Sequence, residues 1–428
     1  MRKGLLAGLG IFGLLGCLGL GVFANAKELR LFAIDAKSGT VQWSSALSDA
    51  KGRSSTPVVS NGKVFTRLVL PQGGDQWKYQ VSAYQADSGK RQWKREIKTQ
   101  HRSADSALIT SSLIVPTPET VLMMLPVEDD EAYSQLMVFD IQTGEYQRSP
   151  HLVFQAFPEV PGFVSDQDSV LAMKLKLETT PQRRSGCDEA KVMLTRQDVW
   201  AQKIQWSVPF PDSFCSHRWQ RPDRFLLANE STVFVDGYEK LQAFNLETGK
   251  IKFEIPVRGN DVALGQATLL VKDRSGIQAY DANTGQSKWT SVDPCGFSSS
   301  FPGLMADDQQ LYMHCYSSPG REEQNRLAAI SLENGHTRWF SNTASQLFHR
   351  PAVTKNEVVV LDTIEKLSSD SKTYVTALSR ADGKVRSRFP ISAPNVYQSV
   401  AADEDQIYVI DRAPRWRHWI AHWNHHWH

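Results

Sequence analysis

Ala279-Tyr280-Asp281-Ala282-Asn283-Thr284-Gly285-Gln286-Ser287-Lys288-Trp289 is the stretch that decides the fold, because its pattern recurs along the chain. We call the pattern Ala-x-Asp-x-x-x-Gly-x-x-x-Trp the repeat phrase. Its glycines stand at positions 39, 89, 144, 249, 285, 335 and 383. Copies that reach the tryptophan end at Trp43, Trp93, Trp289 and Trp339. A phrase that returns every few tens of residues indicates a repeat architecture.

The spacing of the copies predicts one more, damaged copy. Neighbouring glycines are 36 to 55 residues apart, except for the third and fourth, which are separated by 105 residues. Residues 192–206 fit the gap: Asp198 and Trp206 hold the Asp and Trp positions, and Gln202 stands where glycine is expected. The chain therefore contains eight units.

Each phrase is typical of a β-hairpin. Alternating apolar residues such as Leu31 and Ala33 lead into a polar turn, and a second strand leaves it. Glycine supplies the positive φ that closes such a turn, and the Asp side chain caps it. The tryptophan lies four residues beyond the glycine, so it keeps a constant face from which it can pack against a neighbouring unit.

Another pair of apolar strands precedes each phrase, for example 56–59 with 64–70. Four strands in about 50 residues match one blade of a β-propeller. The first phrase begins at Leu29 with no pair before it, and the last pair, Val396–Ala402 with Gln406–Ile410, has no phrase after it. We predict an all-β fold: an eight-bladed β-propeller of four-stranded antiparallel blades, closed by N- and C-terminal strands in one blade.

Residues 1–26 predict export. A charged start is followed by a long apolar run and by Ala24-Asn25-Ala26, which has the small-x-small pattern of a cleavage site. The alternatives are an uncleaved membrane anchor, because the run is long for a signal, and lipidation of Cys17. The expected location is the periplasm or cell envelope. Residues 27–411 would form the propeller and residues 412–428 a tail rich in Trp and His.

The charge balance gives no support to nucleic-acid binding. The chain has 48 basic and 46 acidic residues, and residues 1–26 contain two of the basic ones and no acidic one. The remainder carries 46 of each sign and lacks the basic excess that nucleic-acid binding uses.

Four cysteines follow residue 26, and an even number in an exported chain permits two disulfides. Their places in neighbouring blade segments suggest the pairs Cys187–Cys215 and Cys295–Cys315. The alternative is that all four are buried free thiols.

The repeat phrase with its Thr-Gly turn resembles the pyrroloquinoline-quinone (PQQ) type repeat of a β-propeller superfamily, and the resemblance covers about residues 29–411. One branch of that superfamily contains quinoprotein alcohol and glucose dehydrogenases. The other is the BamB-like group, whose members are eight-bladed scaffold proteins that are periplasmic or anchored by a lipid. The resemblance to this group implies protein partners and no quinone.

The cysteines favour the BamB-like branch. Resemblance to the dehydrogenases implies two adjacent cysteines against PQQ, carboxylate and amide ligands for Ca²⁺, and a catalytic Asp. All cysteines of this chain are separated from one another, and no Cys-x-x-Cys-His motif is present. We therefore expect no cofactor and no catalytic residues, with a PQQ- and Ca²⁺-dependent dehydrogenase as the alternative.

Long polar connections between the second and third strands predict a binding face. They recur in five blades, on the face opposite the phrase turns, where recognition loops are usually built on a rigid scaffold. The alternative is that they are tolerated insertions. The five connections are Pro71–Gln80, Val127–Gln135, Glu178–Lys191, Ser317–Arg326 and Thr363–Thr373.

His-Arg pairs and single arginines precede the innermost strands of several blades. Because those connections gather around the propeller axis, the arginines could ring the channel mouth and bind a carboxylate or an acidic peptide. The alternative is a solvated or salt-bridged role. The residues are Arg53, His101, Arg102, His217, Arg218, Arg258, His349 and Arg350.

Taken together, the sequence predicts an exported, non-catalytic scaffold that binds envelope proteins, as a monomer within a complex. Contact with a membrane through the N-terminal segment is a further expectation, and assembly of outer-membrane proteins is the process that the family resemblance suggests.

Overall fold

A computed structural model gives the fold and describes most of the chain between Lys27 and Pro414. The described residues are 27–49, 52–73, 76–99, 113–114, 119–127, 130–155, 163–166, 169–177, 190–198, 201, 203–214, 226–236, 240–257, 261–273, 275–295, 304–315, 326–342, 351–364, 372–391 and 400–414. The predicted export segment, Cys17 and most of the predicted tail lie outside these ranges.

The described residues form eight sheets, which we number in chain order. Sheet 1 contains β2 (Val41–Asp49), β1 (Lys27–Asp35), β33 (Gln406–Pro414) and β32 (Ala401–Ala402). Sheet 2 contains β3 (Arg53–Ser54), β4 (Val58–Ser60), β5 (Lys63–Gly73), β6 (Gln76–Gln85) and β7 (Arg91–Thr99). Sheet 3 contains β8 (Leu113–Ile114), β9 (Thr120–Val127), β10 (Asp130–Asp140) and β11 (Tyr146–Gln155). Sheet 4 contains β12 (Phe163–Asp166), β13 (Ser169–Leu177), β14 (Ala190–Asp198) and β15 (Ile204–Phe214).

The second half of the chain continues in the same way. Sheet 5 contains β16 (Leu226–Ala228), β17 (Thr232–Asp236), β18 (Leu241–Asn245) and β19 (Ile251–Ile255). Sheet 6 contains β20 (Asp261–Leu264), β21 (Thr268–Lys272), β22 (Ile277–Asp281) and β23 (Ser287–Ser291). Sheet 7 contains β24 (Met305–Ala306), β25 (Gln310–Cys315), β26 (Arg326–Ser331) and β27 (Thr337–Asn342). Sheet 8 contains β28 (Ala352–Val353), β29 (Glu357–Ile364), β30 (Lys372–Ser379) and β31 (Val385–Ile391).

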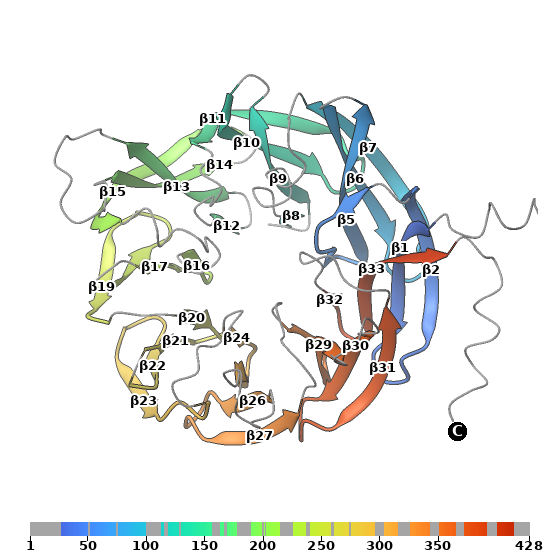
Figure 1. The fold of residues 1–428 in the computed structure, drawn as a ribbon. Helices are drawn as coiled ribbons and strands as arrows, with labels where there is room; N and C mark the ends of the chain where they lie inside the picture. The colour runs from blue at the N-terminus through green and yellow to red at the C-terminus, as the bar shows by residue number, and fades with distance from the viewer. Residues whose placement is uncertain are drawn as a thin grey trace, which may run out of the picture.

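The sheets follow one another around a common centre, with β16 and β20 near the centre and β19 and β23 at the rim (Figure 1). Sheets 3 to 8 are antiparallel meanders whose strands keep their chain order. This confirms the predicted all-β fold of mostly four-stranded antiparallel sheets. Sheet 2 differs because two short strands, β3 and β4, share the innermost place and both pair with β5.

The hydrophobic core lies between neighbouring sheets. One cluster joins Phe65 of sheet 2 to Val121 and Phe139 of sheet 3, and another joins Phe234 of sheet 5 to Leu269 of sheet 6. Sheet 2, for example, buries apolar side chains on both faces, against sheet 1 and against sheet 3, which explains why its central strands are almost continuously apolar.

The repeat phrase forms the hairpin that joins the third and outermost strands of a sheet. In sheet 3 the Asp140 carboxylate accepts hydrogen bonds from the backbone N–H groups of Gln142 and Thr143 and from the Thr143 hydroxyl, at 2.6 to 2.9 Å. Gly144 follows with φ of 69°, a conformation that residues with a Cβ rarely adopt. The Asp therefore holds its own turn, and the predicted turn chemistry is confirmed.

The damaged copy at 192–206 forms the same hairpin, β14–β15. Asp198 Oδ1 accepts from the backbone N–H of Ala201 at 2.6 Å, and the Asp198 N–H donates to the Lys203 carbonyl at 2.9 Å. The capping Asp and the packing of Trp206 therefore keep the unit although the glycine is lost.

In six of the sheets, the side chain at the tryptophan position joins its sheet to the next one. The residue four places after the turn glycine donates a hydrogen bond to the carbonyl three places before the glycine of the following sheet, at 2.8 to 3.1 Å; we call these the seam bonds. The donor and acceptor residues are Trp43 and Ala86, Trp93 and Ile141, Trp206 and Leu246, Trp289 and Leu332, Trp339 and Arg380, and Ser387 and Ala36. The predicted packing of the tryptophan against a neighbouring unit is confirmed.

Sheet 1 combines strands from the two ends of the described chain. All nine residues of β1 pair with β33, from Lys27 opposite Pro414 to Asp35 opposite Gln406. The Ser387 seam bond then joins sheet 8 to sheet 1, and β32 touches both β28 of sheet 8 and β4 of sheet 2.

Candidate binding surface

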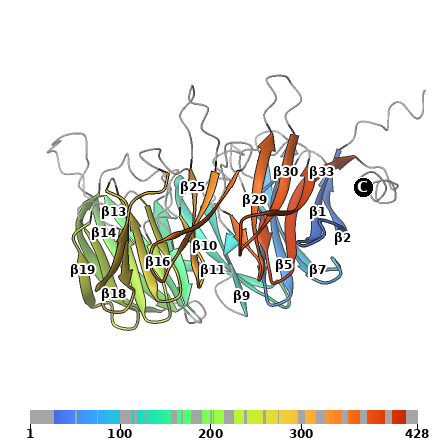
Figure 2. The same cartoon turned by 90° about the horizontal axis from the view of Figure 1, so that it is seen from below.

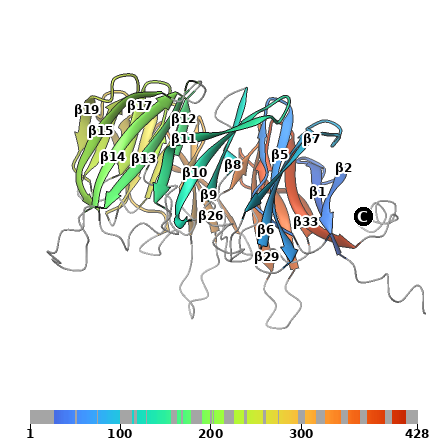
Figure 3. The same ribbon diagram turned by 90° about the horizontal axis from the view of Figure 1, so that it is seen from above.

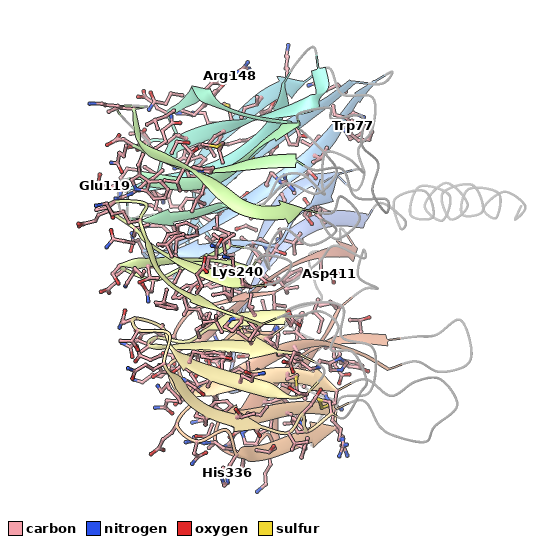
Figure 4. The ribbon with its side chains drawn as sticks, turned by 90° about the vertical axis from the view of Figure 1, so that its left-hand side faces the viewer. Trp77, Glu119, Arg148, Lys240, His336 and Asp411 are labelled. Carbon is pink, nitrogen blue, oxygen red and sulfur yellow. A yellow bond between two sulfur atoms is a disulfide. The ribbon has the colours of Figure 1, made fainter. Side chains whose placement is uncertain are left out.

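The strands run between two faces of the ring, which Figures 2 and 3 show from the side. We call the face with the phrase turns the turn face and the opposite one the hairpin face. Figure 4 places Trp77, from the β5–β6 hairpin, near one face and Glu119, from the turn before β9, at the other.

The structure describes one of the predicted channel-mouth residues. Arg53 lies in the short inner strand β3, where its backbone pairs with Val69 of β5. The ring of basic residues therefore stays a prediction. The other members, His101, Arg102, His217, Arg218, Arg258, His349 and Arg350, lie outside the described residues.

Two of the five predicted loops are strand instead. Within 71–80, Pro71 pairs with Trp77 and Gly73 pairs with Gln76, so β5 and β6 continue almost to the end of their hairpin. Within 127–135, β10 already begins at Asp130, which pairs with Val127. The prediction of irregular loops is wrong here because the polar residues lie on paired strands. The middle parts of the other three connections lie outside the described residues.

A buried arginine supports the β5–β6 hairpin. The Arg67 side chain is fully buried, and its guanidinium carbon lies 6.0 Å from the centre of the Tyr79 ring. Burial lowers the pKa of Arg67 to about 10 and raises that of Tyr79 to about 12. The ring face offers the cation a favourable electrostatic contact away from water. Arg67 is therefore an internal support of the hairpin.

The Arg67–Tyr79 pair was missed from the sequence. Its only signal is a charged residue inside the run Val64-Phe65-Thr66-Arg67-Leu68-Val69, in which all six residues prove to be buried. Charged residues are seldom fully buried, so such a position is informative only after burial is known.

An ion-pair cluster ties the hairpin to the outer strand β7. The Glu96 carboxylate binds the ammonium groups of Lys78 and Lys94 at 2.9 and 2.7 Å. Hydrogen bonds from Lys94 and then Lys78 lower the pKa of Glu96 from 4.5 to about 2. The charged form is thus favoured by folding.

We expect Glu96→Gln to lower the free energy of unfolding by about 0.5–1 kcal/mol at pH 7, because Glu96 is more than a third exposed and water screens the pair. A depressed carboxyl pKa stabilises the fold above the unfolded value, so the difference between the two proteins should shrink as the pH falls from about 4.5 towards about 2. Urea unfolding of both proteins at several pH values measures this. A difference that stays constant down to pH 2 would contradict the assignment.

A disulfide joins sheets 6 and 7, and an ion pair within sheet 6 involves Asp293, two residues before Cys295. Cys295 and Cys315 form a disulfide with a Cα–Cα distance of 4.9 Å, which is the pairing that the sequence suggested. Beside it, the Lys272 ammonium lies 3.0 Å from the Asp293 carboxylate, and both side chains are largely buried. Val292, 82% exposed, is the neighbouring apolar residue. Cys187 and Cys215 lie outside the described residues.

Metal-ligating side chains do not gather in the part of the chain that the structure describes: no group of three or more His, Cys, Asp and Glu residues there could hold a metal ion. Within the same ranges, no helix has the length and apolar character that crossing a membrane requires.

Comparison with known proteins identifies the family. A family model described as outer membrane protein assembly factor BamB matches residues 19–152 and 193–360, more than half of the chain. The chain belongs to the BamB family. Its repeats are those of the PQQ-type β-propeller superfamily, as the repeat phrase predicted.

Several solved structures match the chain at low sequence identity. BamB from Moraxella catarrhalis is 11% identical, over 77% of this chain and 88% of that one, with a TM-score of 0.49. Acylaminoacyl peptidase from Pyrococcus horikoshii is 11% identical, over 80% of this chain and 53% of that one, with a TM-score of 0.50. The β-propeller domain of the Trilobed protease from Pyrococcus furiosus is 10% identical, over 81% of this chain and 98% of that one, with a TM-score of 0.49. No curated protein matches the chain.

Proposed function

We propose that this protein is an exported, non-catalytic propeller scaffold that binds protein partners at the cell envelope through its hairpin face. Membership of the BamB family is the observation that carries the proposal, and the description of that family suggests outer-membrane protein assembly as the process. The proposal includes neither PQQ nor Ca²⁺, in keeping with cysteines that are all separated in the sequence.

The scaffold is proposed to be a closed ring of eight blades, one for each sheet. The seam bonds support this, because a serine makes the last of them from sheet 8 to sheet 1. The contacts of β32 with β28 and β4 support it as well. A closed ring removes exposed sheet edges between its blades and holds the hairpins in fixed positions, which favours specific recognition by lowering the entropy cost of binding.

The paired ends of β5–β6 and β9–β10 are the proposed partner contacts. The first hairpin is supported from inside by Arg67 and from outside by Glu96. The same face carries the exposed Val292 next to the disulfide of sheets 6 and 7.

The experiment shortens the first hairpin without disturbing its base. Leu70 and Lys78 lie opposite each other, so residues 71–77 can be replaced by Asn-Gly, the usual two-residue hairpin turn. The chain itself uses Asn61-Gly62 in this way, with φ of 49° and 66° between paired Ser60 and Lys63. The replacement keeps Lys78 and its bond to Glu96.

We expect the shortened protein to capture its envelope partners at least about ten-fold less in a pull-down, because removing a central contact commonly costs more than about 1.4 kcal/mol. The matched control is Glu333→Ala on an exposed phrase turn of the turn face, which should capture them as the unchanged protein does. Equal capture by all three proteins, each shown to be folded by its unfolding curve, would refute a binding role for this hairpin.

A further inference from the structure

The seam between sheets 5 and 6 departs from the rule that the other seam bonds follow. Phe253 occupies the tryptophan position of sheet 5, and its ring packs against Gly285, as the indole rings pack against the equivalent glycines. A phenyl ring has no N–H, so the carbonyl of Ala282, which corresponds to the bonded carbonyls elsewhere, receives no seam bond from it. This seam is held by apolar contacts, in a cluster that contains Phe253 of sheet 5 and Leu269 of sheet 6.

A second position that donates hydrogen bonds at other seams also lacks a donor side chain at this one. Two residues beyond the tryptophan position, Ser45 donates to the Gly89 carbonyl at 2.6 Å. At the seam of sheets 2 and 3, Arg95 donates from Nε to the Gly144 carbonyl at 3.1 Å and from Nη2 to the Thr143 carbonyl at 2.8 Å. In sheet 5 the same position belongs to Ile255, which is buried in the core and cannot donate.

A hollow of about 470 Å³ opens at this seam, lined by residues of β19, β22 and β23 and of the segments next to them. Figure 1 shows β19 and β23 at the rim of the ring. Its polar lining offers hydrogen-bond acceptors from both sheets. The residues that contribute polar atoms to the lining include Glu254, Asp273, Gln278, Tyr280, Gly285 and Ser287.

Hydrogen bonds hold the acceptors of the hollow in place. Asp273 Oδ1 accepts from the backbone N–H groups of Ser275 and Gly276, and Asp273 Oδ2 accepts from Gln278 at 2.9 Å. The Tyr280 hydroxyl donates to the Gln278 side-chain oxygen. Burial, and then the Asp273 charge, raise the pKa of Tyr280, so this hydroxyl stays protonated.

The charge of the lining is negative. Glu254 and Asp273 are its ionisable acids, and the ammonium group of Lys240 donates to one oxygen of Glu254 at 2.6 Å. A carboxylate has two oxygens with about four acceptor sites. Glu254 accepts from Lys240 and Gln242 through Oε1, so Oε2 retains capacity for a further donor. Asp273 already accepts four hydrogen bonds, from Ser275, Gly276 and Gln278, and contributes its negative charge.

We propose that this hollow binds the guanidinium group of an arginine side chain presented by another polypeptide. Arg95 supplies the model within this protein, because it fills the corresponding place at the seam of sheets 2 and 3 with a guanidinium that meets two turn carbonyls. At the seam of sheets 5 and 6, the equivalent carbonyls are those of Thr284 and Gly285, and Asp273 and Glu254 add charge. A planar group with five donors matches such a set of fixed acceptors. The proposal does not rest on the proposed partner contacts of the β5–β6 and β9–β10 hairpins.

Saturation-transfer NMR on the full chain tests the proposal, with Nα-acetyl-arginine methylamide as the probe. The neutral comparison is Nα-acetyl-citrulline methylamide, which has nearly the same shape. We expect saturation of the arginine side-chain protons and an affinity about five-fold or more above that of the citrulline compound, because one charged contact contributes up to about 1 kcal/mol. Equal binding of the two compounds would overturn the proposal.

Three variants locate the binding. Asp273→Asn keeps the Oδ1 acceptor of the loop but removes the charge, and should weaken the arginine probe about five-fold. Ser287→Arg places a guanidinium inside the hollow and should abolish probe binding while the fold is retained. Asp281→Asn is the matched control, because Asn245 already performs the same turn-capping role in sheet 5, and it should bind the probe normally. Normal binding by the Ser287→Arg variant would place the probe elsewhere and overturn the assignment.

Discussion

Replacing Gly144 by alanine is expected to lower the free energy of unfolding by about 3 kcal/mol. Two costs add up. Gly144 has φ of 69°, where a residue with a Cβ loses about 1–2 kcal/mol. A Cβ at this position would also lie only 2.5 Å from the Trp93 ring, and overpacking of this kind typically costs about 1–3 kcal/mol. Urea unfolding followed by tryptophan fluorescence measures the loss.

Gly62 offers a matched control for the backbone cost alone. Its φ is 66°, nearly the same, but no atom lies within 4 Å of a Cβ built on it. Gly62→Ala should therefore lose only about 1–2 kcal/mol. In a Trp93→Leu background the steric part should disappear, so the two alanine substitutions should then cost about the same. If the two substitutions already cost the same in the unchanged protein, then the contact between position 144 and the Trp93 ring does not contribute to stability, and this prediction is wrong.

The repeat phrase could be predicted because its chemistry is local. A capping Asp, a glycine with positive φ and a tryptophan four residues later act within a dozen residues, so their pattern survives in the sequence without any knowledge of neighbours. The damaged copy keeps two of these three elements: Asp198 still caps the turn, and the Trp206 side chain still donates to the Leu246 carbonyl. The loss of one element left the other two recognisable.

What could not be predicted depends on partners that are distant in the sequence. The segment 71–80 contains Gly73 and other polar residues that favour a loop, but pairing between β5 and β6 overrides this local preference. Arg67 stands in a strand like any other residue until sheet 3 covers it. The hollow between sheets 5 and 6 depends on a comparison of equivalent positions, Phe253 and Ile255, which only the aligned sheets make visible.

The sequence could predict which face of the ring carries the long connections, but not whether these connections are loops or extended hairpins. The sequence placed the elaborated connections opposite the phrase turns, since the strand order of a meander alternates between two faces. It could not distinguish an irregular loop from an extended hairpin, because polar residues and glycine occur in both. The basic residues around the axis are not tested by the described residues, and they remain a prediction.

Truncation after residue 399 is expected to have the largest effect, because it removes β32 and β33 from sheet 1. β1 would lose its partner along all nine of its residues, and the buried Leu29, Leu31 and Ala33 would face an open edge. Unpaired, apolar edges promote aggregation. The truncation also removes buried residues from two core clusters, Tyr408 and Ile410 from one and Val400, Ile407 and Val409 from the other. We expect a loss of more than about 5 kcal/mol, seen as aggregation or as a missing cooperative transition on heating.

Truncation after Pro414 is the matched control, since β33 ends at that residue and sheet 1 stays complete. This protein should unfold as the full chain does. Adding a peptide of residues 400–414 to the shorter protein should restore its transition, because the peptide carries both missing strands and the edge of β1 determines its register. Such rescue requires that the terminal strands meet in one sheet and complete the ring. If the protein ending at residue 399 is as stable as the protein ending at Pro414, then sheet 1 does not close the ring, and the proposal of eight blades fails with it.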